Sequence, residues 1–178
     1  MTQEVLALDI GGTNSRIAIF EITNKGPLLK KKKIVATNSI KDISKFINSF
    51  NKKIENCCIG LAGPVIGTKA KLTNVNLTID VNKIKKDTIL KEVTLINDFQ
   101  ARGHGIKYLS KNEKNMLHRG KKSNNISIVV GPGTGLGKVH IIDNNVYPCE
   151  PGWTTIGISN IDDYALMDYL KNKFDRQV

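Results

Sequence analysis

The sequence is poor in cysteine, proline and aromatic residues. Its 178 residues include three cysteines and five prolines, and aromatic residues make up 6%. Cys57 and Cys58 are adjacent, and neighbouring residues of a strand point to opposite faces. Three cysteines in this arrangement exclude a disulfide framework, so we interpret them as small hydrophobic residues.

Long hydrophobic runs are also absent. The longest apolar segments fall far short of the ~20 residues that a helix needs to cross a bilayer. The first residues, MTQEVLALDIGG, lack the basic region and the small-residue cleavage site of a secretory signal. We therefore expect a cytoplasmic protein that is not inserted in a membrane.

Acidic residues are outnumbered. The chain has 27 Lys and Arg against 16 Asp and Glu, which gives a formal net charge of +11. Lys30–Lys33 is the densest basic cluster, and the other lysines are scattered. No RNP motif, zinc knuckle or recognition helix accompanies them, so we expect no nucleic-acid partner. A solvated basic surface that attracts anionic phosphates explains the charge.

Hydrophobic periodicity predicts an α/β protein. A boundary near Leu109 would divide it into residues 1–109 and 110–178. Ser39 and Asp42 have the spacing of a capping box at the start of the first helix. The expected strands are 5–10, 15–22, 28–36, 57–62, 93–98, 126–130, 138–143 and 146–148, and residues 71–79 are expected to form irregular strand or loop. The lysines of 28–36 predict an exposed edge strand. The expected helices are 39–53, 81–90, 99–109, a short helix capped by Ser110 and Glu113, and a last helix over 160–174 capped by Asn160 and Asp163.

One pattern occurs twice: a strand, a glycine-rich turn and an alternating strand. The turns are GGTN at 11–14 and GPGTGLG at 131–137. The second does not fit the Walker A pattern, because Pro132 replaces its first glycine and Val139 its Ser or Thr. Uncovered backbone N–H groups in such turns can bind a phosphate, and a tight turn without a ligand is the alternative. Two turns of this kind, facing one another, would clamp a nucleotide.

Two carboxylates lie at the ends of predicted strands. Asp9 precedes the first glycine turn, where it could hold Mg²⁺ through water. Asp98 ends the strand 93–98, where it could accept the proton of a hydroxyl that attacks a phosphoryl group, beside the amide of Asn97. The alternative role for Asp98 is to cap the helix 99–109.

Four segments together resemble one family. DIGGTN at 9–14, AGPVIGTKAKLTN at 62–74, LINDF at 95–99 and GPGTGLG at 131–137 are similar to the ATP-dependent bacterial-type glucokinases of the actin-like ATPase superfamily. The resemblance covers nearly the whole chain. It implies an actin-like (ribonuclease H-like) ATPase fold, with a mixed sheet and helices, in which one lobe is complete and the second is incomplete.

The same resemblance implies an activity and a site. The activity is transfer of the γ-phosphoryl group of ATP, with Mg²⁺, to the 6-hydroxyl of glucose in a cleft between two lobes. It makes Asp98 the catalytic base and associates Asp9 with Mg²⁺ through water. The implied phosphate-binding residues are Asp9, Gly11, Gly12, Thr13, Asn14, Gly133, Thr134, Gly135 and Gly137, and the implied sugar-binding residues are Asn74, Asn97, Asp98, Glu150 and Trp153.

Two departures from the family pattern leave alternatives open. Where the family has Glu-Gly-Gly-His, this chain has Glu150-Pro151-Gly152-Trp153, and an indole cannot accept a hydrogen bond. Another hexose or an amino sugar is therefore an alternative substrate. The family pattern continues past Val178, so we expect the N-terminal portion of a kinase, or else a sugar-binding remnant without catalysis. A homodimer is possible, as in other family members.

Overall fold

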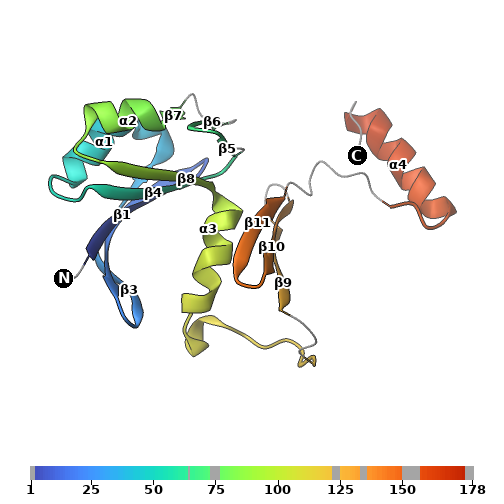
Figure 1. Cartoon of the computed structure of the whole chain (residues 1–178). Coiled ribbons are helices and arrows are strands. Elements are labelled where there is room, and N and C mark those ends of the chain that lie inside the picture. Colours follow the sequence, from blue (N-terminus) through green and yellow to red (C-terminus); the bar gives the residue numbers. More distant parts are fainter. Residues whose placement is uncertain are drawn as a thin grey trace. The chain divides into compact units, whose positions relative to one another are not determined.

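The computed structural model describes residues 3–63, 65–72, 77–121, 125–132, 136–149 and 157–174 (Figure 1). The chain divides into two compact units, Met1–Ser123 and Asn124–Val178. The lobe boundary expected after residue 109 stays a prediction. Among the described residues, no helix has the length and apolar character needed to cross a membrane.

A five-stranded mixed sheet forms the centre of the first unit, in the order β3-β2-β1-β4-β8. The N-terminal hairpin and the edge strand pair antiparallel, whereas β4 and β8 run parallel to β1. The strands are β1 (Gln3–Ile10), β2 (Asn14–Thr23), β3 (Gly26–Ala36), β4 (Asn56–Leu61) and β8 (Glu92–Asn97). This mixed sheet confirms the predicted α/β class.

The core lies on one face of this sheet. Leu6, Leu8 and Ile10 alternate along β1 with more exposed residues, and they pack with the buried side chains of α1 (Ile43–Phe50) and α2 (Val81–Asp87). Alternation in a strand places such residues on a single face. The apolar face of the sheet and the apolar sides of α1 and α2 therefore meet in one hydrophobic core.

The first helix begins later than the sequence suggested. The predicted capping box of Ser39 and Asp42 is wrong, because Asp42 is itself the N-cap and accepts a hydrogen bond from the Lys45 N–H at 3.1 Å. Ser39 instead ends a 3₁₀ turn over Thr37–Ser39. Both residue types favour helix N-termini, so composition alone did not decide between them.

Helix α3 (Asp98–Gly105) packs on the opposite face of the sheet (Figure 1). Gly60 of β4 lies between the core residues Ile59 and Leu61 and so points away from the core. A Cβ atom at Gly60 would lie 3.3 Å from the Cβ of Ala101. This close approach requires a small residue in β4 and fixes the start of α3 near the ends of the strands.

A small second sheet lies between β4 and α2 in the chain. It consists of β5 (Val65–Ile66), β6 (Lys69–Lys71) and β7 (Thr78–Asp80), all antiparallel. Asp80 ends β7 and caps α2 by accepting from the N–H groups of Asn82 and Lys83. The segment expected to be irregular thus includes short strands on both sides of residues 73–76.

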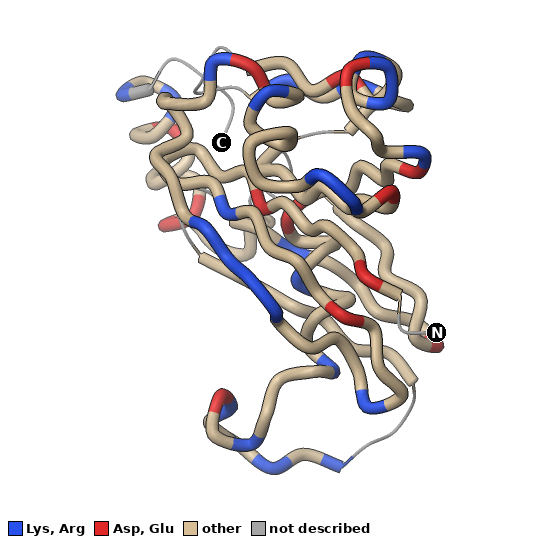
Figure 2. Tube along the Cα trace, turned by 90° about the vertical axis from the view of Figure 1, so that its left-hand side faces the viewer, with Lys and Arg blue, Asp and Glu red and all other residues tan. Residues whose placement is uncertain are grey.

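Strand β3 forms an edge of the large sheet, as predicted. Lys30–Lys33 are exposed on it and make the continuous basic run in Figure 2. Lys30 binds Glu21 at 2.8 Å, and Lys31 lies 4.7 Å from the ring centre of Phe50. Lysines discourage pairing at a sheet edge.

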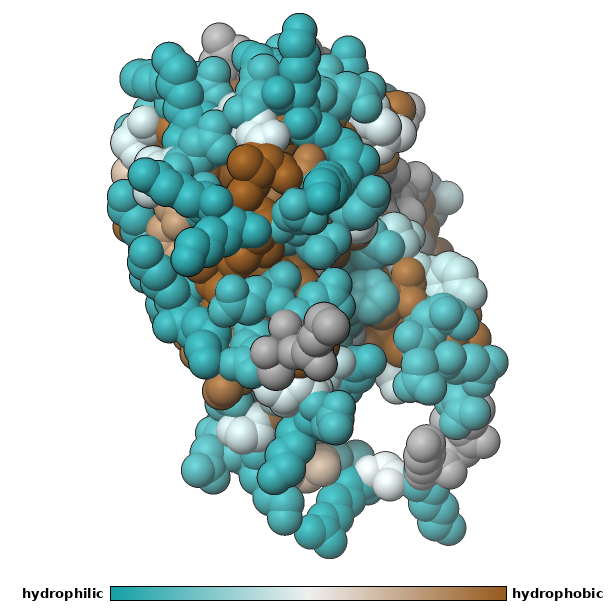
Figure 3. Space-filling view, turned by 60° about the vertical axis from the view of Figure 1, so that its left-hand side comes forward, coloured by the Kyte–Doolittle hydropathy of each residue, from teal (hydrophilic) through white to brown (hydrophobic). Residues whose placement is uncertain are grey.

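In Figure 3 hydrophilic side chains surround a central hydrophobic area on the face shown.

The second unit contains a three-stranded antiparallel sheet and a helix. The strands are β9 (Ile126–Pro132), β10 (Leu136–Ile142) and β11 (Asn145–Cys149), and the helix is α4 (Ile161–Phe174). Asn160 caps α4 by accepting from the N–H groups of Asp162 and Asp163, which confirms the predicted cap. Asp143 and Asn144 have positive φ in the β10–β11 turn, where these residue types are tolerated.

Candidate active site

The first glycine turn joins β1 to β2. The Gly11 N–H donates to the Asn14 carbonyl oxygen at 3.1 Å, which closes the turn. A Cβ atom at Gly11 would lie 2.8 Å from that oxygen, a distance that real Cβ contacts do not reach. Gly12, Thr13 and Asn14 are exposed. The first of the predicted phosphate turns is therefore a tight hairpin whose tip faces solvent.

Asp9 lies one residue before the end of β1. Its side chain is 52% exposed, and its Oδ2 accepts a 2.8 Å hydrogen bond from Nη1 of Arg16 on β2. Within the described residues, Oδ1 of Asp9 has no partner. An ion pair this exposed contributes little to stability, but it fixes the direction of the carboxylate beside the glycine turn.

Asn97 ends β8 and caps helix α3. Its Oδ1 accepts from the N–H groups of Phe99 at 2.8 Å and Gln100 at 3.4 Å. Its Nδ2 donates to the Gly63 carbonyl oxygen at 3.2 Å. The helix cap was the alternative role considered for Asp98. Asn97 fills that role, and the Asp98 carboxylate is not the cap.

The environment of Asp98 changes the pKa of its carboxyl. The side chain is 20% exposed, and burial raises the pKa of Asp98 above its ordinary value. Arg102, one turn along α3 with Nη2 3.6 Å from Oδ2, lowers this pKa, and the charge of Asp9 raises it. The two predicted carboxylates are thus close enough to influence each other.

Strand order explains why Asp9 and Asp98 come together. β1, β4 and β8 are parallel neighbours, with Asp9 opposite Gly60 and Leu61 opposite Asn97. The carboxyl ends of parallel strands meet at one edge of a sheet, which is where ligands bind in open α/β sheets. The glycine turn, Asp9 and Asp98 therefore lie at the same edge of the first unit.

The second glycine turn belongs to the second unit. Gly131 of β9 pairs with Gly137 of β10, so the strands predicted around this turn form a hairpin. Six of the predicted site residues lie outside the described residues: Asn74, Gly133, Thr134, Gly135, Glu150 and Trp153. Their roles, and the predicted clamp between the two turns, stay predictions.

Sequence patterns did not identify three residues that contact this site. Arg16 binds Asp9, Arg102 lies beside Asp98, and Thr37 donates from Oγ1 to the Gly11 carbonyl oxygen at 2.7 Å. The spacing of Asp98 and Arg102 on one helix, i and i+4, could have revealed that pair. No local sequence pattern indicates Thr37, because it reaches the turn from the 3₁₀ turn that follows β3.

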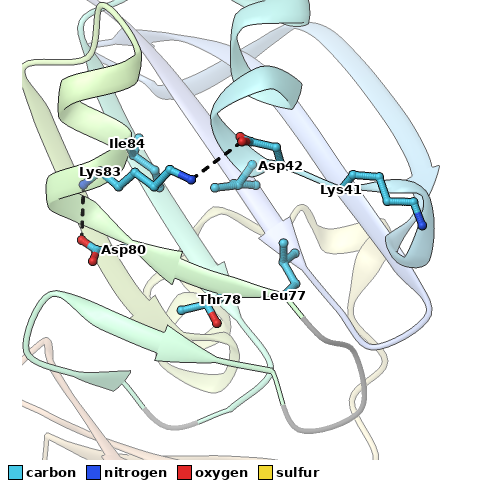
Figure 4. A pocket seen from close by; sticks show the side chains of 8 residues that line it. Lys41, Asp42, Leu77, Thr78, Asp80, Lys83 and Ile84 are labelled. Carbon is cyan, nitrogen blue, oxygen red and sulfur yellow. Dashed lines mark hydrogen bonds and ion pairs between the residues drawn. The ribbon is translucent and has the colours of Figure 1, made fainter.

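A shallow pocket elsewhere in the first unit contains none of the predicted site residues (Figure 4). Two of its charged groups pair, with Lys83 Nζ 3.8 Å from Oδ2 of Asp42. Asp80 accepts from backbone N–H groups at the start of α2. The lining residues are Lys41, Asp42, Ile43, Leu77, Thr78, Asp80, Lys83 and Ile84. Within the described part of the chain, no group of three or more His, Cys, Asp or Glu could hold a metal ion.

Sequence comparison identifies relatives over nearly the whole chain. The family model described as glucokinase matches residues 6–178. A glucokinase of Trichormus variabilis is 32% identical over 185 residues, which cover 97% of this chain and 54% of that protein. The glucokinase of Synechocystis is 26% identical over 190 residues, which cover 95% of this chain and 54% of that protein. The chain therefore spans about half the length of the curated relatives it matches.

Structure comparison identifies the same fold. The crystal structure of a glucokinase from an Antarctic psychrotroph superposes with a TM-score of 0.80 at 23% identity, over 98% of this chain and 58% of that one. A glucokinase from Balamuthia mandrillaris, solved in complex with glucose, gives a TM-score of 0.66 at 17% identity, over 97% of this chain and 56% of that one. These similarities confirm the predicted fold class.

Proposed function

This chain belongs to the glucokinase family, and from that premise we propose that it is part of a kinase that phosphorylates the 6-hydroxyl of glucose with ATP. One observation carries the proposal: Asp98 lies at the sheet edge that also holds the exposed glycine turn. Asn97 caps α3, so the Asp98 carboxylate is left for another role. A carboxylate beside a phosphate site is the arrangement that phosphoryl transfer to a hydroxyl requires.

In the proposed step, the sugar oxygen attacks the γ-phosphorus while the bond from that phosphorus to the bridging oxygen of ADP breaks. Asp98 accepts the proton of the hydroxyl, and ADP leaves with the electrons of the broken bond. The proton must be accepted by an ionised carboxylate. The raised pKa of Asp98 makes it a stronger base than an ordinary aspartate.

The residues of the first glycine turn fit a magnesium–nucleotide complex. Mg²⁺, when bound with ATP, neutralises the charge that develops on the phosphate oxygens. This cation keeps several waters and takes only one or two protein carboxylates. Asp9 offers one half-exposed carboxylate beside the turn, and the exposed N–H groups of Gly12 and Thr13 would face the phosphates.

Two residues bear on which acceptor sugar the kinase uses. Asn97 could bind a sugar hydroxyl only through groups that the α3 cap leaves available, because Oδ1 already accepts twice. Trp153 replaces the histidine of the family pattern, and this favours testing another hexose and an amino sugar beside glucose. Cytoplasmic location and a homodimer stay predictions that rest on the family.

Sugar phosphorylation by the chain tests the proposal. Glucose, mannose and glucosamine are each incubated with MgATP and the chain, and sugar 6-phosphate and ADP are measured. We expect product with at least one sugar, and a rate at least about a hundredfold lower for Asp98→Asn, the low end of general-base effects. Sugar binding without any product would favour the alternative, a sugar-binding remnant without catalysis.

A further inference from the structure

Thr37 lies beneath the first glycine turn. It follows the end of β3, and its side chain is completely buried. The Thr37 Oγ1 donates to the Gly11 carbonyl oxygen at 2.7 Å, and the Thr37 backbone N–H donates to the Thr13 carbonyl oxygen at 2.9 Å. One residue just after β3 therefore holds two carbonyl groups of the turn.

These two bonds set the direction of the turn's N–H groups. The described residues contain no cis peptide bond, and in a trans peptide the C=O of one residue and the N–H of the next point in opposite directions. Because the Gly11 carbonyl points toward Thr37, the Gly12 N–H points away from it. The same geometry at the Thr13 carbonyl turns the Asn14 N–H away from Thr37.

The Gly12 N–H is available to a ligand. Gly12 is exposed, and within the described residues its N–H has no acceptor. An uncovered N–H at the tip of a turn is the kind of donor that binds an anionic oxygen. The bond between Thr37 and Gly11 therefore sets the direction of a donor on the other side of the same peptide.

Ser15 completes a buried chain of hydroxyl groups. Its Oγ lies 2.8 Å from Oγ1 of Thr37, and both side chains are fully buried. A hydroxyl group has one proton, and Thr37 donates its proton to Gly11. Ser15 must therefore donate to Thr37, in the order Ser15 to Thr37 to Gly11, and such chains strengthen each bond.

We propose that Thr37, supported by Ser15, is a positioning residue for phosphate binding by the first glycine turn. It does not contact the phosphate itself. Its hydroxyl holds the Gly11–Gly12 peptide in the orientation that presents the Gly12 N–H to a phosphate oxygen. The inference rests on the proposed function, because it takes the turn to be the place where the ATP phosphates bind.

The test compares three variants of the full chain: Thr37→Val, which keeps the shape and removes the hydroxyl, Thr37→Ser, which keeps the hydroxyl, and Ser15→Ala. The probe is tripolyphosphate with Mg²⁺, and binding is followed by the amide NMR signals of Gly12 and Thr13. Urea unfolding of each variant, at the temperature of the binding experiment, shows whether that variant is folded there. A purely structural role would change the urea midpoint without changing the affinity of the folded protein.

We expect the wild-type Gly12 signal to shift with added tripolyphosphate. Thr37→Val should bind about fivefold more weakly, the factor that corresponds to one hydrogen bond of about 1 kcal/mol. Thr37→Ser should bind within about twofold of wild type, and Ser15→Ala should lie between these two variants. If Thr37→Val does not fold, Thr37→Ala, which also removes the hydroxyl bonded to the Gly11 carbonyl oxygen, carries the test.

Two failures have different meanings. If the wild-type signals of Gly12 and Thr13 do not respond to tripolyphosphate, the turn is not a phosphate site, and the proposed function and the role of Thr37 both fail. If wild type responds and Thr37→Val binds equally well while folded, the role of Thr37 alone is wrong. Unchanged affinity in folded Thr37→Ala, should Thr37→Val not fold, would have the same meaning.

Discussion

Asp98 illustrates how a largely buried carboxyl makes the stability of the folded chain depend on pH. Burial raises the pKa of its carboxyl in the folded chain, despite the opposing charge of Arg102. In an unfolded chain an aspartate has a pKa of about 3.9. Between these two values the folded state holds more protons than the unfolded state, so folding becomes less favourable as the pH rises.

Changing Asp98→Asn should remove this pH dependence. We expect the free energy of unfolding of wild type to fall, relative to that of Asp98→Asn, as the pH rises from about 3 through the folded pKa of Asp98. Below the unfolded value of about 3.9 both states are protonated and the difference should be constant. Urea unfolding of both proteins from pH 3 to 8 measures it. A wild type that gains stability over the variant with rising pH would contradict the raised pKa.

Gly11 and Gly105 should respond to alanine in opposite ways. A Cβ atom at Gly11 would meet the Asn14 carbonyl oxygen at 2.8 Å, whereas nothing lies within 4 Å of one at Gly105. We expect Gly11→Ala to lower the free energy of unfolding by about 1–3 kcal/mol, as overpacking does. Gly105→Ala in α3 should raise it by up to about 1 kcal/mol. Urea unfolding of both variants decides this, and equal effects would show that the turn can relax.

At the scale of single residues, the sequence predicted the polar residues that lie within or beside a motif. It did not predict those that contact the site from parts of the chain distant in sequence. Asp9, Gly11 and Asp98 stand next to strands or turns that hydrophobic patterns reveal. Arg16 reaches Asp9 across a strand pair, and Thr37 reaches the turn from the residues that follow β3. The sequence does not show which strands are neighbours. Asn97 was predicted as a sugar ligand, but its role as the α3 cap depends on where the helix begins.

At the scale of elements, the contact between β4 and α3 determines where Asp98 lies. A Cβ atom at Gly60 would lie 3.3 Å from that of Ala101, so a β-branched side chain there would force α3 outward. We expect Gly60→Val to lower the free energy of unfolding by about 1–3 kcal/mol and to shift the Asp98 carboxyl signal in NMR spectra. Gly120→Val is the matched control, since nothing lies within 4 Å of a Cβ atom there. Equal stability of the two variants would show that α3 is not held by this contact.

Most elements were predictable, and their ends were less so. Alternating residues revealed β1 and β2, and the edge position of β3 followed from its lysines. The helix predicted over 81–90 ends at Asp87, and the helix predicted over 99–109 passes into a 3₁₀ turn over Ile106–Tyr108. Helix ends depend on capping bonds, and hydrophobic periodicity does not contain them. The sequence did not predict the order of the strands in the sheet, which the structure shows.

At the scale of the whole molecule, each of the two compact units contains one of the two glycine turns. The first unit, Met1–Ser123, contains the glycine turn at 11–14 together with Asp9 and Asp98. The second unit contains the hairpin around Gly131 and Gly137. Because the first unit has its own sheet and hydrophobic core, phosphate binding by its turn should not need the second unit.

Limited proteolysis tests whether the first unit is independent. Residues 114–121 form no helix or strand and all are exposed, and such segments are the preferred sites of cleavage. We expect trypsin to cut first at Lys114, Arg119 or Lys121 and to release a fragment that contains the five-stranded sheet. Mass spectrometry identifies the cuts, and circular dichroism tests whether the purified fragment stays folded. The fragment should keep the response of its Gly12 signal to tripolyphosphate. Early cleavage within β1, β4 or β8 would show instead that the sheet depends on the rest of the chain.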